Sequence, residues 1–177
     1  MNRLDDSLAA GLAERGKAAR YGPAVYIAAP LAAILCQVYL PRFFPALSYL
    51  ELPLLVAVYF ALMRRRPASG AVTGCLIGLA QDALSPQPLG MNGISKTLAG
   101  YFAASLSMRF DVEHPVLRFV LSFFFFIFHQ FFFWALSRGL LGRQVDFPVP
   151  QTVIYAFLNS VIAAALFGFL DRFRRED

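Results

Sequence analysis

The chain has 177 residues, of which 58% are apolar, and it carries a formal net charge of +5. Its mean hydropathy of +0.58 is well above that of an ordinary soluble domain, and its length leaves room for about six membrane spans of roughly 20 residues and little else. A separate soluble catalytic or nucleic-acid-binding domain is therefore excluded, and the basic residues are expected to indicate membrane orientation rather than nucleic-acid binding.

Residues 1–22 are expected to form a cytoplasmic tail, and they lack the apolar core of a cleavable signal peptide. Leu4, Leu8 and Leu12 recur every four residues among basic side chains, so the tail could lie on the membrane surface as an amphipathic helix. A solvated tail is the alternative, because two glycines interrupt the pattern.

Residues 23–170 are expected to form one transmembrane domain, an all-α polytopic membrane bundle of six helices, followed by a basic cytoplasmic tail at 171–177. The predicted spans cover residues 23–40, 47–63, 68–84, 93–110, 115–136 and 150–170. Prolines support these limits, because nearly all of them fall at span ends or in turns, where a missing backbone N–H costs least.

The placement of lysine and arginine predicts that both termini are cytoplasmic, because basic residues concentrate in the cytoplasmic loops of membrane proteins. The predicted cytoplasmic side carries Arg3, Arg15, Lys17, Arg20, Arg64, Arg65, Arg66, Arg109, Arg118, Arg172, Arg174 and Arg175. The predicted outer side carries only Arg42, Lys96, Arg138 and Arg143.

The most distinctive stretch is a predicted helical hairpin over residues 70–107. Gly70, Gly74, Gly78 and Asp82 recur every four residues and so form one stripe along the first helix. In lipid, such small residues let a second backbone approach closely. The second helix offers a matching small-residue face, and the predicted antiparallel register pairs Gly78 with Gly100, Gly74 with Ala104 and Asp82 with Lys96.

Asp82 and Lys96 are predicted to lie near the outer ends of their helices, within snorkelling distance of the membrane interface. Ionisable groups inside a membrane are expensive and are expected to pair, reach water or bind something. One interpretation is a structural ion pair that fixes the hairpin. The other is a binding locus for a substrate or a partner group.

Other polar residues also fall inside predicted spans, namely Gln37, Gln81, His129, Gln130 and Asn159. His129 is expected to be a satisfied interior histidine, because no second histidine or cysteine stands at metal-ligand spacing near it. No serine, histidine and acid arrangement is apparent either. The sequence therefore predicts no enzyme, no metal and no cofactor. Phenylalanines surround His129 and Gln130 on the fifth span, so part of that span is expected to face lipid or a partner helix.

The stretch from Gly78 to Gly90, followed by a small-residue helix, resembles the signature of the MreD family of rod shape-determining membrane proteins. An aspartate follows a glycine by four residues, and a short turn then leads to Leu-Gly; the matching residues are Gly78, Asp82, Leu89 and Gly90. The resemblance implies a non-enzymatic scaffold of the bacterial cell-wall elongation complex in the inner membrane. Its implied partner is MreC and, through MreC, the MreB filaments and the transpeptidase–glycosyltransferase pair that makes peptidoglycan.

The MreD family also distantly resembles the six-span substrate-binding subunits of energy-coupling-factor vitamin transporters, which gives an alternative function. A vitamin-binding subunit needs an outward pocket lined with polar groups, whereas a scaffold needs exposed partner-binding surface. Short outer loops and the broad apolar surface of the aromatic span favour the scaffold. An ion or proton carrier is a third class, but acids are missing from the inner half of the predicted spans.

Overall fold

The computed structural model describes residues 20–175, so most of the N-terminal tail, including its predicted amphipathic helix, lies outside the described residues. The described part contains six α-helices: α2 (Pro23–Phe43), α3 (Leu52–Arg64), α4 (Pro67–Leu84), α5 (Met91–Ser107), α6 (Pro115–Gly139) and α7 (Val149–Asp171). A 3₁₀ helix, η1 (Pro45–Tyr49), precedes α3. Two-residue strands, β1 (Arg20–Tyr21) and β2 (Arg174–Arg175), pair antiparallel.

Each of the six predicted spans corresponds to one of these helices, so the predicted all-helical architecture is confirmed. Four helical segments are long and apolar enough to cross a membrane: Pro23–Phe43, Leu47–Arg64, Pro115–Gly139 and Val149–Asp171. The remaining two helices, α4 and α5, carry the glycines and polar residues of the hairpin, which lower their hydropathy.

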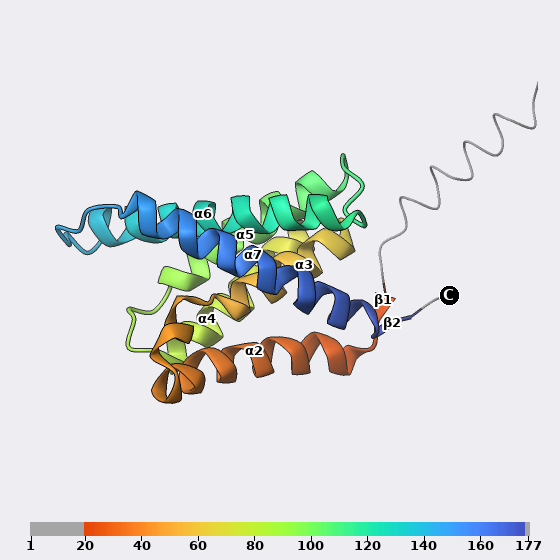
Figure 1. Ribbon diagram of the computed structural model, residues 1–177, viewed down its shortest axis with the longest axis horizontal. Helices are drawn as coiled ribbons and strands as arrows, with labels where there is room; N and C mark the ends of the chain where they lie inside the picture. Colours follow the sequence, from red (N-terminus) through yellow and green to blue (C-terminus); the bar gives the residue numbers. More distant parts are fainter. Residues whose placement is uncertain (1–19, 176–177) are drawn as a thin grey trace, which may run out of the picture.

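The helices run back and forth between two ends of the bundle (Figure 1). One end, here called the terminal end, holds β1, β2 and the connections at 65–66 and 108–114. The other, here called the turn end, holds η1 and the connections at 85–90 and 140–148. The two ends of the described chain therefore lie together.

Helix α3 is the centre of the molecule. All of its residues from Pro53 to Met63 are buried, and the other helices surround it. With 13 residues it is about 20 Å long, well short of the roughly 30 Å hydrocarbon core of a bilayer. Its N-terminus consequently begins inside the bundle, where its free N–H groups need protein partners.

The predicted span at 47–63 agrees with the apolar segment Leu47–Arg64, but within it the α-helix begins only at Leu52, after η1 ends at Tyr49. Pro53 follows this break. Because proline has no backbone N–H, it could not donate the hydrogen bond that a continuous helix would need at this position. The backbone N–H of Glu51 bonds to the side chain of Asn159, and that of Leu52 to Gln37, at 2.9 and 3.2 Å. Side chains from α7 and α2 thus replace the bonds that the break removes.

The α4–α5 hairpin packs backbone against backbone, as the glycine stripe predicted, but in a different register. Gly70 faces Gly100, Gly74 faces the carbonyl of Lys96, and Gly78 faces that of Asn92. A Cβ atom at any of these three glycines of α4 would overlap the opposite backbone. Gly100 was expected to meet Gly78 and instead meets Gly70, so the register is shifted by eight residues, or two repeats of the stripe.

A network of polar side chains connects the helices at the terminal end. Tyr59 of α3 donates a hydrogen bond to the carboxylate of Asp171 at 2.7 Å, and the hydroxyls of Tyr59 and Tyr21 are 2.8 Å apart. Arg118, near the start of α6, forms an ion pair with the same Asp171 and donates to the carbonyl of Val112 at 2.8 Å. These contacts join α3, α6, α7 and the segment before α2.

Candidate functional site

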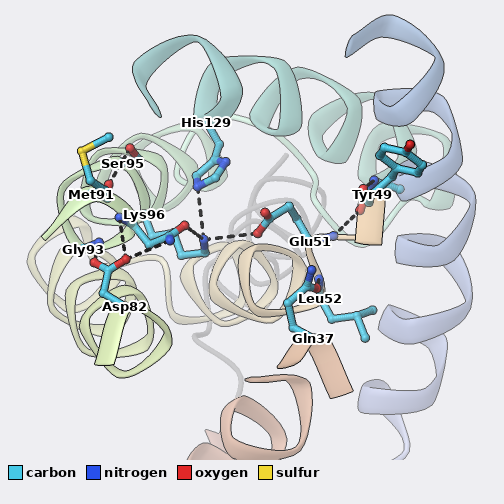
Figure 2. Close-up of polar contacts among 12 residues, drawn as sticks. Gln37, Tyr49, Glu51, Leu52, Asp82, Met91, Gly93, Ser95, Lys96 and His129 are labelled. Carbon is cyan, nitrogen blue, oxygen red and sulfur yellow. Dashed lines mark hydrogen bonds and ion pairs between the residues drawn. The ribbon is translucent and has the colours of Figure 1, made fainter. Parts of the chain in front are cut away.

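Asp82, in the last turn of α4, caps the N-terminus of α5. Its Oδ2 accepts hydrogen bonds from the backbone N–H groups of Gly90 and Gly93, at 2.9 and 3.1 Å. Figure 2 shows the carboxylate beside Gly93. Its Oδ1 accepts from the backbone and the side-chain amide of Asn92, at 3.2 and 2.9 Å. The carboxylate therefore satisfies free donors at the positive end of the α5 dipole, where a negative charge is stabilised. It is 3% exposed and needs no cation beside it.

Gly90 gives the turn its shape. Its φ of 99° is in the left-handed region, which a side chain disfavours, and this conformation directs its N–H to Asp82. The preceding residue, Leu89, projects away from the bundle and is 74% exposed. The turn thus combines an internal anchor with an apolar side chain on its outer surface.

Lys96 lies at the centre of a separate set of contacts. Its ammonium is 3.3 Å from Glu51 Oε2, 2.7 Å from Asn92 Oδ1 and 3.1 Å from His129 Nε2 (Figure 2). The three groups come from the start of α3, from α5 and from α6. Three acceptors match the three protons of an ammonium group. Lys96 is fully buried, and this network holds the three helices together.

The predicted ion pair between Asp82 and Lys96 is therefore wrong, and so is the prediction that Lys96 snorkels to the interface. Asp82 is already saturated by the start of α5, and Lys96 turns inward to Glu51. The two residues are linked only indirectly, through Asn92, whose amide nitrogen donates to Asp82 and whose oxygen accepts from Lys96.

The contacts of Lys96 also assign the tautomer of His129. Because the ammonium has only protons to offer, His129 Nε2 acts as the acceptor, and the ring proton sits on Nδ1. His129 is 1% exposed, and its Nδ1 has no hydrogen-bond partner among the residues that the structure describes. The expected satisfied interior histidine is thus only half satisfied.

Asn159 connects α7 to the start of α3. Its Oδ1 accepts from the N–H of Glu51, and its amide nitrogen donates to the carbonyls of Tyr49 and Tyr155, at 2.9 and 2.8 Å. It is fully buried. By holding the backbone at Glu51, it positions the carboxylate that meets Lys96.

A cavity of about 570 Å³ adjoins this cluster at the turn end. Glu51, Asn92 and His129 contribute to its wall from the cluster, and Gln81 and Gln130 add further amide groups. Oε1 of Gln81 is buried and, within residues 20–175, has no hydrogen-bond partner. The wall therefore combines polar and apolar side chains. Two of its residues, Gln81 and His129, each also have a buried polar atom without a partner among residues 20–175.

A smaller, apolar groove of about 200 Å³ lies on the α4–α5 hairpin itself. Leu79 and Ile94 line it, and the small residues Gly90 and Gly93 leave it space. Exposed apolar side chains continue this surface along both helices: Val72, Leu76, Tyr101 and Phe102.

The structure brings Asp82, Lys96, His129 and Asn159 into one connected network, and it puts Gly70, Gly74, Gly78 and Gly100 in one helix interface. Leu89 and Gln130 lie apart from the network, on the exposed turn and in the cavity wall. The sequence analysis missed Glu51 and Asn92. An acidic residue inside an apolar run, two positions before Pro53, was the available signal for Glu51.

The network offers little for catalysis. Within residues 20–175 no group of three or more histidine, cysteine, aspartate or glutamate side chains could hold a metal ion. The carboxylate of Asp82 and the ammonium of Lys96 are both occupied by fixed hydrogen bonds. Such an arrangement fixes helices and shapes a cavity wall.

Comparison with known proteins gives one match. The family profile described as rod shape-determining protein MreD matches residues 20–175, nearly the whole chain. No curated protein and no solved structure matches the chain, so the comparisons show no likeness to the vitamin-binding subunits of energy-coupling-factor transporters. In the Asp82–Gly90 turn that the signature singled out, the left-handed Gly90 donates its backbone N–H to the Asp82 carboxylate. The chain belongs to the MreD family of rod shape-determining proteins.

Proposed function

We propose that this protein is a non-enzymatic scaffold of the bacterial cell-wall elongation complex and binds the transmembrane segment of MreC through helix faces inside the membrane. Through MreC it contacts MreB filaments and the transpeptidase–glycosyltransferase pair indirectly. Family membership and the four apolar helices support a membrane protein of rod-shape determination. The observation that carries the proposal further is the exposed apolar groove on the α4–α5 hairpin.

The hairpin suits this role because the face on which α4 and α5 pack together, its inner face, differs in character from its exposed outer face, which carries the groove. The inner face is locked by the glycine packing and by the Asp82 cap, so the outer face is held rigidly. In lipid the hydrophobic effect does not drive helix association, and close packing on a shaped surface decides affinity. A groove over Gly93, bordered by Leu79 and Ile94, offers such a surface to one partner helix.

A second candidate surface is the exposed side of α6. Val116, Val120, Phe124 and Phe131 are each about half exposed or more, whereas Phe125 and Phe126 pack into the core. The sequence predicted this division of the aromatic span. We place the partner helix on the hairpin because the groove there gives it a shaped surface.

We further propose that the protein crosses the inner membrane six times with both termini in the cytoplasm. The terminal end carries the arginines of the 64–66 connection, together with Arg109, Arg172 and Arg174. The turn end carries Arg42, Arg138 and Arg143. This bias assigns the terminal end to the cytoplasm and the α4–α5 turn to the periplasm.

The test is co-purification of tagged MreC with the full chain in mild detergent, comparing two variants of matched exposure. Ile94 is 45% exposed beside the groove, and Val153 is 44% exposed on α7. Ile94→Trp should fill the groove and reduce co-purified MreC at least fivefold, whereas Val153→Trp should leave it unchanged. Both variants should insert and elute as folded protein.

The same variants should be introduced into a rod-shaped host that depends on this chain. Cells with Ile94→Trp should round up, and cells with Val153→Trp should remain rods. Undiminished MreC binding by Ile94→Trp would exclude the groove. Loss of binding in Val153→Trp alone would place the partner on α7.

A further inference from the structure

The cavity at the turn end has two charged side chains in its wall, and their charges are opposite. Of the described residues that line it, only Glu51 and Arg42 carry a formal charge. Glu51 is the residue before α3, and Arg42 is in the last turn of α2. Arg42 is exposed and Glu51 is partly buried, so the positive charge lies at the mouth and the negative charge deeper in the wall.

The carboxylate of Glu51 is held in place but is not saturated. Its Oε2 accepts from Lys96 at 3.3 Å (Figure 2), and its backbone N–H is fixed by Asn159. Its Oε1 has no hydrogen-bond partner within residues 20–175. The side chain is 18% exposed, and Oε1 is not one of the buried unpaired atoms of the described chain, so this oxygen is accessible from the cavity. A carboxylate oxygen at such a position is stabilised by a hydrogen-bond donor that enters the cavity.

Arg42 likewise has no carboxylate partner. None of the ion pairs among residues 20–175 includes it, and its guanidinium lies 5.1 Å from the centre of the Tyr39 ring. A guanidinium that stacks on an aromatic ring keeps its N–H groups available to an anion. Arg42 can therefore bind an anionic group at the mouth of the cavity.

The two opposite charges restrict the ligand. A cation without an anionic group would bind Glu51 but would be repelled by Arg42 at the mouth. An anion without a positive group would bind Arg42 but would be repelled by the carboxylate. A zwitterion satisfies both side chains with charge-assisted hydrogen bonds. Exposed Leu84 and partly buried Phe133 add apolar wall for the carbon atoms of such a ligand.

We propose that this cavity binds a zwitterion whose primary ammonium group donates to Glu51 and whose anionic group accepts from Arg42. A phosphoethanolamine diester, in which a short carbon chain joins the two charges, has this chemistry. The cavity volume of about 570 Å³ falls within the range of small-molecule sites, roughly 300–1,000 Å³. The site lies apart from the hairpin groove and does not depend on MreC binding there.

The test measures how fast a cysteine in the cavity wall reacts. Ser85 lines the cavity and is partly exposed, so Ser85→Cys is placed in the purified full chain after Cys36 and Cys75 have been replaced by alanine. Modification by uncharged methyl methanethiosulfonate is followed with increasing glycerophosphoethanolamine. The comparison probes are glycerophosphocholine, whose ammonium has no proton to donate, ethanolamine as a cation, and dimethyl phosphate as an anion.

Glycerophosphoethanolamine should slow the modification saturably. At concentrations that fill most cavities the rate should fall by about threefold or more. The three comparison probes should act much more weakly, because each lacks one of the two hydrogen-bonding charges.

Two arginine variants at the turn end test the anionic half of the site. Arg42→Gln should abolish the protection, because the phosphate loses its partner. Arg143→Gln, in the connection between α6 and α7 and outside the cavity, should keep it. Both side chains are exposed, so neither substitution should change the melting temperature in detergent appreciably. Protection retained in Arg42→Gln, or lost equally in both variants, would overturn the proposal.

The carboxylate is tested together with its neighbour, because removing Glu51 alone would leave the buried Lys96 ammonium uncompensated. The double variant Glu51→Gln with Lys96→Met removes both charges. In the folded double variant glycerophosphoethanolamine should lose its advantage over dimethyl phosphate. A retained advantage would overturn the role of Glu51. If the double variant does not fold, the comparison of Arg42→Gln with Arg143→Gln decides.

The zwitterion can come from a phospholipid headgroup or from a free small molecule. The Ser85→Cys chain in nanodiscs of phosphatidylethanolamine and of phosphatidylcholine distinguishes these sources. Slower modification in phosphatidylethanolamine, abolished by Arg42→Gln but not by Arg143→Gln, would assign the site to a headgroup. Equal rates in the two bilayers, both slowed by glycerophosphoethanolamine, would assign it to a free zwitterion. Equal rates without any effect of glycerophosphoethanolamine would overturn the proposal.

Discussion

Among the single residues, the notable feature is that each buried charge has its own set of partners. Asp82 is held by four hydrogen bonds at the start of α5, and Lys96 by acceptors from three helices. A buried ion pair is weak evidence for stability, but removing one member leaves an uncompensated charge that costs several kcal/mol, on the order of 3–5. Replacing Lys96 should therefore be more damaging when Glu51 remains than when it is replaced as well.

A double-mutant cycle with Glu51→Gln and Lys96→Met checks this expectation. The two should couple by at least about 1 kcal/mol in detergent unfolding, because their side chains are 3.3 Å apart. The cycle of Lys96→Met with Asp82→Asn should give a smaller coupling, because only Asn92 links that pair. If Lys96 couples more strongly with Asp82 than with Glu51, the network is arranged differently.

At the scale of helices, the two hairpin elements depend on backbone contact that only glycine allows. A Cβ at Gly74 would overlap the carbonyl of Lys96, and neither helix can relieve the overlap by rotating one side chain. Gly168, in the last turn of α7, has open space around it. The same substitution should consequently have opposite effects at the two positions.

Gly74→Ala should lower stability in detergent by about 1–3 kcal/mol, because the two helices must separate to accept the methyl group. Gly168→Ala should be neutral or stabilising by up to about 1 kcal/mol, since alanine is the better helix former. Thermal unfolding of the purified variants measures both effects. Equal losses at the two positions would mean that the α4–α5 contact is looser than the structure describes.

The sequence predicted where the helices lie and which glycines face their neighbour, but it could not predict the register. The stripe repeats every four residues, so sliding one helix by two repeats keeps the same glycines in the interface. The contact that selects one register is Asp82 with the N–H groups of Gly90 and Gly93. Those groups are free only because α5 begins there, which depends on the turn and not on the stripe.

The sequence predicted some residues of the candidate site but not the contacts between them. Asp82, Lys96, His129 and Asn159 stand out as polar residues within apolar spans, so composition alone identifies them. Their partners do not stand out. Glu51 joins the network because α3 starts inside the bundle, and Gln81 and His129 line one cavity only once α4 and α6 are placed in space.

For the molecule as a whole, the two ends of the bundle have different character. The terminal end is closed by the β1–β2 pair and by the network around Asp171, and most of the arginines in residues 20–175 lie at or near this end. The turn end contains the cavity beside the Lys96 network and the exposed Leu89 of the α4–α5 turn. The proposed orientation assigns the closed, basic end to the cytoplasm and the end with the cavity to the periplasm.

Cysteine labelling of spheroplasts tests this orientation. Gln87 is exposed in the turn after α4, and Ala68 is exposed in the first turn of α4, so the two positions mark opposite ends of one helix. In the chain without Cys36 and Cys75, a membrane-impermeant maleimide should label Gln87→Cys in intact spheroplasts and Ala68→Cys only after permeabilisation. Full labelling of both after permeabilisation is the control for reactivity. External labelling of Ala68→Cys with protection of Gln87→Cys would invert the assignment and place the cavity in the cytoplasm. Labelling of both from outside would mean that α4 does not cross the membrane, because an 18-residue helix about 27 Å long would then have both ends on one side.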